Sequence, residues 1–227
     1  MIRLSSEQRA TRERLTMPES GYHDHLRPEL LRHFPQGARR LLDVGCGEGA
    51  LSLGLDDLQS RELWGIELDA AAAQVAASRL DKVLVGDAAA LVNELPDAHF
   101  DCVFCNDILE HLVWPEEFLL TLATKLAPGG TLISSVPNVR HFWTVVDLVM
   151  KGRWDYADEG ILDRTHLRFY TRATMREMFE RTGYQVDSVE GLNPLGSARF
   201  KLFNLATLGF FREMGFLQYV WVLRRGS

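Results

Sequence analysis

The sequence predicts an α/β domain built on a largely parallel sheet. Short apolar runs of strand length alternate with helical segments between residues 41 and 137, which is the pattern of βαβ units. The chain has 227 residues, of which 46% are apolar and 25% charged, so it is long enough and apolar enough to bury one sizeable core. We therefore expect a folded globular domain rather than a disordered chain.

The expected elements of the first part follow in a regular order. An opening helix is predicted at residues 22–34, and strands at residues 41–44, 62–68, 82–86, 100–106 and 131–137. Helices between the strands are predicted at residues 49–59, 69–80, 88–94 and 115–126. Asp69 is placed to cap the second of these helices, and Pro115 begins the last one with two acids in its first turn. A Pro-Gly-Gly turn then separates that helix from the fifth strand.

The regular alternation breaks after residue 138. A helix is predicted at residues 139–150, and the loop that follows it to residue 170 is rich in charged and aromatic residues. The chain then continues with a helix at 171–183, a strand at 184–192, an apolar segment at 198–211 and a strand at 216–225. We expect the two late strands to close the sheet as an antiparallel pair.

Composition disfavours several classes of protein. A net charge of −6 argues against a nucleic-acid partner, which usually meets a basic face. No apolar run approaches the length of a membrane span, and the first residues lack the apolar core of a signal peptide. Three cysteines do not make a disulfide framework. A cytoplasmic protein with a small-molecule substrate is therefore expected, and a homodimer is left open.

Two of the cysteines have the CxxC spacing of redox and zinc sites. Cys102 and Cys105 both fall in the strand predicted at residues 100–106. Side chains three residues apart on a strand point to opposite faces of the sheet. We therefore expect neither a redox nor a zinc role for this pair.

A glycine-rich loop follows the first strand. Gly45, Gly47 and Gly49 let a ligand approach the backbone, and their spacing alone would also suit a dinucleotide. However, Asp43 and Glu48 place two carboxylates at the loop, and these would repel a pyrophosphate. A phosphate-binding P-loop is excluded because no Gly-Lys-Ser/Thr follows. A cationic ligand fits better, and S-adenosylmethionine carries a sulfonium and an ammonium but no phosphate.

Further acids stand at the ends of the next two strands. Glu67 ends the second strand about 20 residues after the loop, where a carboxylate can accept both ribose hydroxyls. Asp87 follows the third strand, where an acid can accept from an adenine amino group. Strand-end acids also often cap the next helix. Ligands of open α/β sheets bind at these carboxyl ends, so the acids together favour an adenosine site.

Five motifs occur together in one order. LLDVGCGEG, GIELD, VGDA, FDCVFCNDILEHL and LAPGGTLISSVPN resemble the successive motifs of class I S-adenosylmethionine-dependent methyltransferases, over about residues 38–190. The resemblance implies a Rossmann-like, doubly wound α/β fold. Its seven-stranded sheet has the order 3-2-1-4-5-7-6 with strand seven antiparallel. Residues 1–37 would then be an N-terminal arm and helix covering the cofactor site, with Tyr22 over the cofactor. Residues 38–227 would be the methyltransferase domain, with a substrate-shaping insertion at 139–170.

The same resemblance implies a set of residues that bind S-adenosylmethionine. This set comprises Asp43, Gly45, Cys46, Gly47, Gly49, Glu67, Leu68, Asp87, Ala88 and Asn106. The glycines would line the methionine part of the cofactor with Asp43 behind it. Glu67 would hold the ribose, and Asp87 and Ala88 would face the adenine. Asn106 and Asp107 would lie near the sulfonium.

The catalytic candidates lie beyond the fourth and fifth strands. Methyl transfer to oxygen needs an aligned acceptor and a base, and an imidazole suits this task near neutral pH. His111 is the first candidate base, His166 with Asp163 as orienting partner is the second, and His141 is the third. Asp107 is also a catalytic candidate. A histidine at a helix end bonded to backbone is the alternative interpretation of His111.

A metal site is a competing interpretation of the same segment. Asp107, Glu110 and His111 share a helical face by spacing, and some quinone O-methyltransferases resemble this segment and use a divalent metal there. Glu110 can equally be a buried or capping acid. The sequence therefore leads us to expect no metal.

The acceptor is the least determined part of the prediction. Residues 163–184 resemble a bacterial subgroup linked to cell-surface sugar synthesis, so the hydroxyl of a sugar or related small polar molecule is favoured. Within the insertion, Arg153, Arg164 and Arg168 could grip an anionic group, and Trp143 and Trp154 could stack on a ring. A solvated loop with a small aromatic core is the alternative. An aromatic or quinone-like acceptor and a non-catalytic cofactor-binding regulator are the other functions left open.

Overall fold

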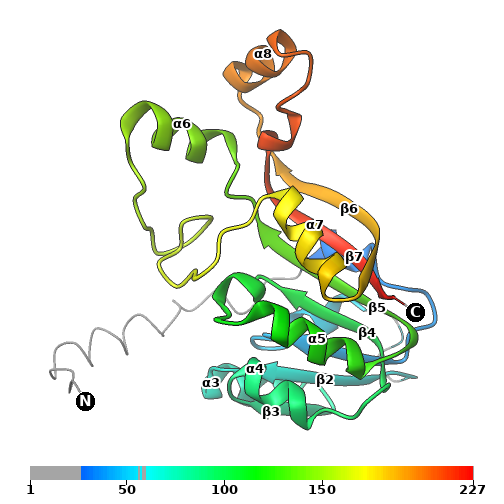
Figure 1. The fold of residues 1–227 in the computed structure, drawn as a ribbon. Coiled ribbons are helices and arrows are strands. Elements are labelled where there is room, and N and C mark those ends of the chain that lie inside the picture. The colour runs from blue at the N-terminus through cyan, green and yellow to red at the C-terminus, as the bar shows by residue number, and fades with distance from the viewer. Residues whose placement is uncertain (1–26, 56, 58–59, 227) are drawn as a thin grey trace, which may run out of the picture.

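The computed structural model describes residues 27–55, 57 and 60–226, and within these it contains one seven-stranded sheet (Figure 1). The strands are β1 (Arg40–Val44), β2 (Glu62–Glu67), β3 (Lys82–Val85), β4 (Phe100–Asn106), β5 (Leu126–Pro137), β6 (Tyr184–Pro194) and β7 (Phe216–Arg225). Their order is β3-β2-β1-β4-β5-β7-β6. The first five strands are parallel, and β7 is antiparallel to both of its neighbours. The predicted order and the antiparallel last strand are confirmed.

The helices follow the predicted alternation with shorter bounds. The described α-helices are α2 (Pro28–Leu31), α3 (Ala70–Ala76), α4 (Ala88–Leu91), α5 (Pro115–Lys125), α6 (Phe142–Lys151), α7 (Arg172–Arg181) and α8 (Ala198–Ala206). Short 3₁₀ helices are η1 (Ala50–Gly54), η3 (Val92–Glu94), η4 (Leu109–His111) and η5 (Arg212–Gly215). Asp69 caps α3 as expected, because its carboxylate accepts from the amides of Ala71 and Ala72. Among the described residues, none of the helices has the length and apolar content needed to span a bilayer.

Three expected boundaries are wrong. The helix expected at residues 49–59 is only the 3₁₀ helix η1 in its described part, because glycines stand at both of its ends. The helix expected at 22–34 is only α2 in its described part, since the residue before Pro28 is disfavoured in helical conformation. Strand β5 begins at Leu126, before the predicted Pro-Gly-Gly turn. A side chain at Gly130 would come within 2.8 Å of the carbonyl oxygen of Phe100, so glycine is required where β5 meets β4.

The core has two halves, one on each face of the sheet. Along β4, Val103 and Cys105 pack into one buried cluster, and Cys102 and Phe104 pack into the other. The two cysteines of the CxxC spacing therefore lie on opposite faces, as predicted from strand geometry. All three cysteines of the chain are buried and unpaired.

The topology brings the predicted site residues to one edge of the sheet. Strands β1, β2, β4 and β5 are parallel, so the segments that follow them meet at their common carboxyl end. The segment after β5 leaves the sheet as α6 and returns where the amide of Val139 donates to the carbonyl oxygen of Tyr170. In Figure 1, α6 and α8 stand apart from the sheet at one end of the molecule.

Candidate active site

The loop after β1 is a backbone cradle. Gly45, Gly47 and Gly49 have φ values of 73°, 54° and 78°, a left-handed conformation that side chains disfavour. A Cβ atom at Gly45 would also lie 2.3 Å from the Cδ1 atom of Ile108. The positive φ values therefore favour glycine at all three positions, and Gly45 also lies against the side chain of Ile108. Cys46 lies between them with its side chain buried against Gly65.

Glu67 ties the end of β2 to this loop. Its two carboxylate oxygens accept from the amides of Gly47 and Asp69, both at 2.8 Å. Each oxygen keeps a further lone pair, so the carboxylate can still accept from a ligand hydroxyl. The next residue, Leu68, is an apolar side chain that is 70% exposed beside this buried acid. The residues predicted for the ribose end of the cofactor therefore form a polar and an apolar surface side by side.

Asp43 carries an unusual charge environment. Burial raises the pKa of its carboxyl to about 7, and the neighbouring Glu67 adds to the rise, whereas Arg27 opposes it. Two carboxyl groups thus lie near one another at the end of the sheet with limited solvation. A cationic ligand would relieve this repulsion. The site residues therefore fit a sulfonium and ammonium compound such as S-adenosylmethionine, as the sequence predicted.

Asp87, the third predicted acid, caps helix α4. Asp87 is the first residue outside α4, and its carboxylate accepts from the amide of Ala89 at 2.7 Å. This contact is the capping interaction that the sequence also allowed. Ala88 begins α4 next to it. A contact of these two residues with adenine stays a prediction.

Two polar residues stand at the carboxyl end of β4, Asn106 as its last residue and Asp107 directly after it. The amide oxygen of Asn106 is buried and has no partner among the described residues. An orphaned acceptor of this kind is costly unless a ligand satisfies it. Asp107, with a left-handed φ of 54°, accepts from Arg27 at 2.7 Å, from Ser135 at 3.1 Å and from Gln218 at 3.2 Å. Asp107 is therefore the centre of a hydrogen-bond network rather than an isolated carboxylate.

Arg27 is a site residue that sequence reasoning missed. Its guanidinium donates to Asp107 and, at 2.6 Å, to Glu29, so it sits over the ends of β4 and β5. Asp107 lies 80 residues away in sequence, and no local motif links the two. The only sequence signal was a basic residue directly before the proline that starts α2. Residues 1–26, including Tyr22, lie outside the described part of the chain.

His111 and His166, the two leading base candidates, are brought together. Their ring centres are 4.7 Å apart with the rings at 73° to one another. The Nδ1 atom of His166 lies 3.0 Å from the carbonyl oxygen of Ile161, which can only accept, so Nδ1 carries the proton. The Nδ1 atom of His111 lies 3.3 Å from the carbonyl oxygen of Thr165, which assigns its proton in the same way. Both histidines therefore keep an unprotonated Nε2 atom.

The expected partner of His166 was wrong. Asp163 accepts from the amide and the hydroxyl of Thr165, at 2.7 Å and 2.6 Å, and it does not bond His166. The hydroxyl of Thr165 in turn lies 3.2 Å from Nδ1 of His111. Asp163 therefore orients His111 through Thr165. His141, the third candidate, is buried at the start of α6, and burial lowers its pKa.

Glu110 is a buried acid beside the two histidines. Its side chain is 1% exposed, and neither carboxylate oxygen has a hydrogen-bond partner among the described residues. One oxygen lies 4.0 Å from Nε2 of His166. Burial, and secondarily the charge of Asp107, raises the pKa of Glu110 well above its usual value. Burial, and secondarily the neighbouring His166, lowers the pKa of His111.

These three side chains could also hold a metal ion. Ligand atoms of Glu110, His111 and His166 all lie within 4.8 Å of one another. Imidazoles fixed through Nδ1 by a carbonyl oxygen are typical of metal-binding histidines, and the two unbonded oxygens of Glu110 fit a cation. This set differs from the one weighed on sequence, because Asp107 is bonded to Arg27 and His166 stands in its place.

The insertion does not present free arginines. Arg153 bonds Asp155 at 2.6 Å, Arg164 bonds Asp158 at 2.7 Å, and Arg168 donates to the carbonyl oxygen of Val113. The aromatic side chains form small clusters instead. Trp154 packs on Phe169 with ring centres 5.2 Å apart, and Phe169 lies 6.3 Å from His166. Trp143 packs on Phe142. The insertion thus has a small aromatic core next to the histidine pair.

Fold and site together define a class I S-adenosylmethionine-dependent methyltransferase, and comparison with known proteins agrees. A family model for a methyltransferase domain matches residues 18–189, so the chain belongs to that family. A crystal structure of a SAM-dependent methyltransferase from Archaeoglobus fulgidus has the same fold, with a TM-score of 0.67 at 21% identity. It covers 87% of this chain and 92% of that one. The protein is therefore an enzyme that uses S-adenosyl-L-methionine.

Curated relatives carry more specific names. A ubiquinone biosynthesis O-methyltransferase of Burkholderia multivorans is 29% identical over 188 residues, which are 76% of each chain. A probable S-adenosylmethionine-dependent methyltransferase of Mycolicibacterium smegmatis is 28% identical over 154 residues. That match covers 68% of this chain and 55% of the relative.

Proposed function

We propose that this enzyme methylates an oxygen atom of a small aromatic or quinone-like acceptor, with His111 as the base. The observation that carries the proposal is the pair of oriented imidazoles, His111 and His166, beside the strand end that holds Asn106 and Asp107. The relative from Burkholderia multivorans is named as an O-methyltransferase of ubiquinone biosynthesis, which supports oxygen as the acceptor atom. Sugar hydroxyls, favoured by the sequence, have no support from the named relatives.

The chemistry of the acceptor also favours a phenolic hydroxyl. A phenol has a pKa of about 10, far closer to that of an imidazole than an aliphatic alcohol is. The insertion offers aromatic rings rather than free charges next to the base, since Trp154 and Phe169 pack near His166. A flat, apolar ring with an ionisable hydroxyl suits these surroundings. A charged sugar phosphate would meet arginines that are already bonded.

Cofactor binding is assigned to the carboxyl edge of the sheet. S-adenosylmethionine, when bound, supplies an electrophilic methyl group on its sulfonium. In our proposal the loop of Gly45 to Gly49 gives backbone contacts to the methionine part, and Glu67 accepts from the ribose. The exposed Leu68 covers one face of the adenine. Arg27 is the nearby guanidinium that can pair with the cofactor carboxylate, and its position over β4 and β5 supports this role.

His111 removes the proton from the acceptor hydroxyl. Its lowered pKa keeps the imidazole neutral at pH 7, and the bond to Thr165 leaves the lone pair on Nε2. Because the methyl donor needs little further activation, the remaining task of the protein is alignment and exclusion of water. His166 and the aromatic core of the insertion provide walls for that purpose. Asp107 acts by holding Arg27 in place.

A metal-assisted form of the same reaction is a second candidate. It is favoured by the two unbonded, buried oxygens of Glu110 facing Nε2 of His166. A divalent ion on Glu110, His111 and His166 would lower the pKa of the acceptor hydroxyl as a Lewis acid. In that case His111 is a ligand and not a base.

The test uses methyl-labelled S-adenosylmethionine with a panel of catechol-type quinols and sugar nucleotides, before and after thorough chelation. Labelled quinol formed equally with and without chelator supports the His111 base. Activity lost on chelation and restored by one divalent ion supports the metal form. Label only in the sugar nucleotides overturns the aromatic acceptor. Tight cofactor binding without any turnover over a wider acceptor panel would support the regulator that the sequence left open.

We also propose that the enzyme works in the cytoplasm. The support is that Cys46, Cys102 and Cys105 are all buried and unpaired, which is typical of proteins in a reducing compartment.

A further inference from the structure

Helix α8 and the turn after it expose an unusual number of large apolar side chains. Leu202, Leu205, Leu208 and Phe210 are all exposed, and Leu208 is 96% exposed. Soluble surfaces normally scatter such residues singly, whereas these four lie within nine positions of one another. The exposure therefore calls for a binding partner of apolar character.

The exposure does not come from a poorly attached helix. Phe200 on the inner face of α8 is buried, and Phe142 of α6 packs on Phe200 and Phe203 with ring centres 5.2 and 5.3 Å apart. Below the helix, the side-chain amide of Asn138 donates to the carbonyl oxygens of Glu213 and Phe216. One face of α8 is thus fastened to the domain, and the other face is presented outward.

The turn after α8 holds its apolar tip in place. Leu208 and Gly209 both have left-handed φ values, 52° and 79°, and the amide of Gly209 donates to the carbonyl oxygen of Asn204 at 2.7 Å. A left-handed leucine is disfavoured and is kept only where the surroundings determine it. The conformation projects Leu208 away from the fold. Apolar tips of this kind suit insertion into a soft apolar phase better than contact with a flat protein surface.

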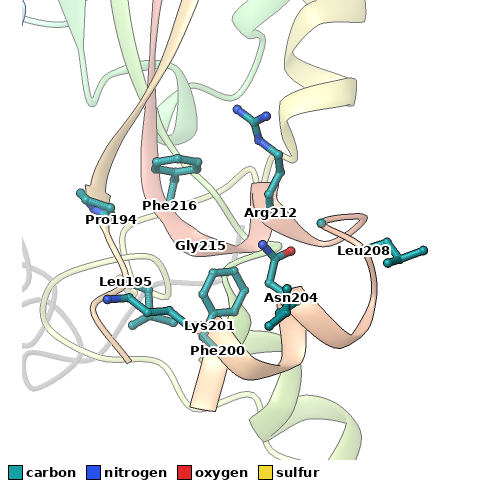
Figure 2. Close-up of a pocket in the computed structure, with 11 residues that line it drawn as sticks. Pro194, Leu195, Phe200, Lys201, Asn204, Leu208, Arg212, Gly215 and Phe216 are labelled. Atoms are coloured by element: carbon teal, nitrogen blue, oxygen red, sulfur yellow. The ribbon is translucent and has the colours of Figure 1, made fainter. Parts of the chain in front are cut away.

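A cavity of about 650 Å³ opens beneath the exposed face, between the end of β6, α8 and the start of β7 (Figure 2). Leu195, Phe200, Leu205 and Phe216 give it mainly apolar walls. Figure 2 shows the basic side chains of Lys201 and Arg212 extending from different sides of it. The cavity thus has apolar walls and basic side chains beside them, a combination that suits the binding of an anionic amphiphile.

The charge of this segment is opposite to that of the whole chain. Residues 198–212 contain Arg199, Lys201 and Arg212 and no acid, although the net charge of the protein is −6. No ion pair found among the described residues involves any of these three cations. By contrast, the arginines of the insertion at 153 and 164 are paired with acids. Positive charge is therefore left available at the apolar face.

We propose that α8 and its turn dock this enzyme on an anionic lipid surface. The leucines and Phe210 enter the boundary between headgroups and acyl chains, and the three cations pair with lipid phosphates. The nine residues of α8 are far too few to cross a bilayer, so the helix lies in the surface plane. The exposed Leu148, Val149 and Met150 of α6 extend the apolar area at the same end of the molecule (Figure 1).

A second copy of the chain is a poorer occupant of this face. In a two-fold dimer the same patch of both subunits meets. The cations Arg199, Lys201 and Arg212 of one subunit would then lie against the same cations of the other, and residues 198–212 contain no acid to separate them. An anionic bilayer offers an apolar interior and negative charge at once. The cytoplasmic leaflet carries such charge.

The test is co-sedimentation of the full-length enzyme with two kinds of vesicle, phosphatidylcholine alone and phosphatidylcholine mixed with phosphatidylglycerol. We expect binding to the mixed vesicles only, weakened by salt. The charge variant Arg199→Glu/Lys201→Glu and the apolar variant Leu205→Asp/Leu208→Asp should each weaken this binding at least about tenfold. Leu120→Asp, at an exposed leucine of α5, is the matched control and should bind as the wild type does.

Methyl transfer in vesicle-free solution is measured for every variant and should be unchanged, which shows that the variants fold. Equal binding to both vesicle types, or full binding by both α8 variants, overturns the proposal. Light scattering supplies a further check. A dimer that the apolar variant dissociates, together with no vesicle binding, would assign the face to self-association and overturn lipid docking.

Discussion

The two halves of the active site are built in different ways. The proposed cofactor half consists of the glycine loop, Glu67 and Leu68, which are parts of short contiguous motifs at strand ends. The proposed acceptor half consists of Glu110, His111 and His166, which come from two separate stretches of chain. Backbone conformation organises the first half, whereas long-range side-chain contacts organise the second. The cofactor half can consequently be predicted from the sequence, and its binding of the cofactor depends less on any single side chain.

The largest expected effect is that of removing the imidazole of His111, which should impair the proposed acceptor half and leave the cofactor half intact. His111→Ala should lower kcat by about 10²–10⁴-fold, because the proton acceptor is lost. The affinity for S-adenosylmethionine, measured by calorimetry, should stay the same. In the wild type, kcat should rise with pH through the lowered pKa of His111 and be level at neutral pH.

His99→Ala, at the opposite end of β4, is the control for this change and should leave kcat unaffected. A His111→Ala enzyme that retains full turnover would show that the histidine pair has no part in the chemistry. A loss of cofactor affinity equal to the loss of kcat would show that the two halves are not separable.

The next effect tests whether Arg27 belongs to the cofactor half. Arg27→Met should weaken S-adenosylmethionine binding about 10–100-fold, the value of a hydrogen bond to a charged group. It also leaves Asp107 without its ion-pair partner. Arg32→Met, five residues on and paired with Glu190, is the matched control and should bind normally. Unchanged affinity of the Arg27 variant would place this residue on the acceptor side instead.

The smallest effect concerns the charge at Asp43. Its pKa in the folded protein is about 7, above the ordinary value of 3.8, so it favours the folded state below pH 4. This contribution is lost as pH rises through 7. Relative to the wild type, Asp43→Asn should therefore gain stability between pH 5 and pH 8, by on the order of 2 kcal/mol, and the two proteins should be equally stable only below pH 4, where the carboxyl is protonated in the unfolded chain as well.

Denaturant titration at the two pH values measures this difference, and Asp147→Asn on exposed α6 serves as control. The wild type should also bind S-adenosylmethionine more tightly at pH 8 than at pH 5, because the ionised carboxyl attracts the cationic ligand. Asp43→Asn should lose that pH dependence. A variant that is less stable than the wild type at pH 8 would mean that the ionised carboxyl stabilises the folded protein, so that the pKa of Asp43 is not raised.

The α/β class, the glycine loop and the acids beside it could be predicted from the residues alone, whereas the strand order came from the family resemblance. Strand β4, for example, has the predicted bounds, because a short and nearly continuous apolar run between helical segments is typical of a strand buried on both faces. The family resemblance predicted that β7 is antiparallel. The glycine loop could be predicted because a left-handed backbone conformation restricts the choice of residue. These predictions depended on local conformational preferences and on short motifs in the sequence.

The contacts of the proposed acceptor half, and the position of Arg27, could be seen only in the folded structure. It paired His111 with His166, gave Asp163 to Thr165 rather than to His166, and placed Arg27 on Asp107. It also showed the arginines of the insertion already bonded and the apolar face of α8 turned outward. These facts depend on which distant side chains meet in space and which stay exposed. Spacing along the chain does not encode such contacts, because each arises from the packing of elements that are far apart in sequence.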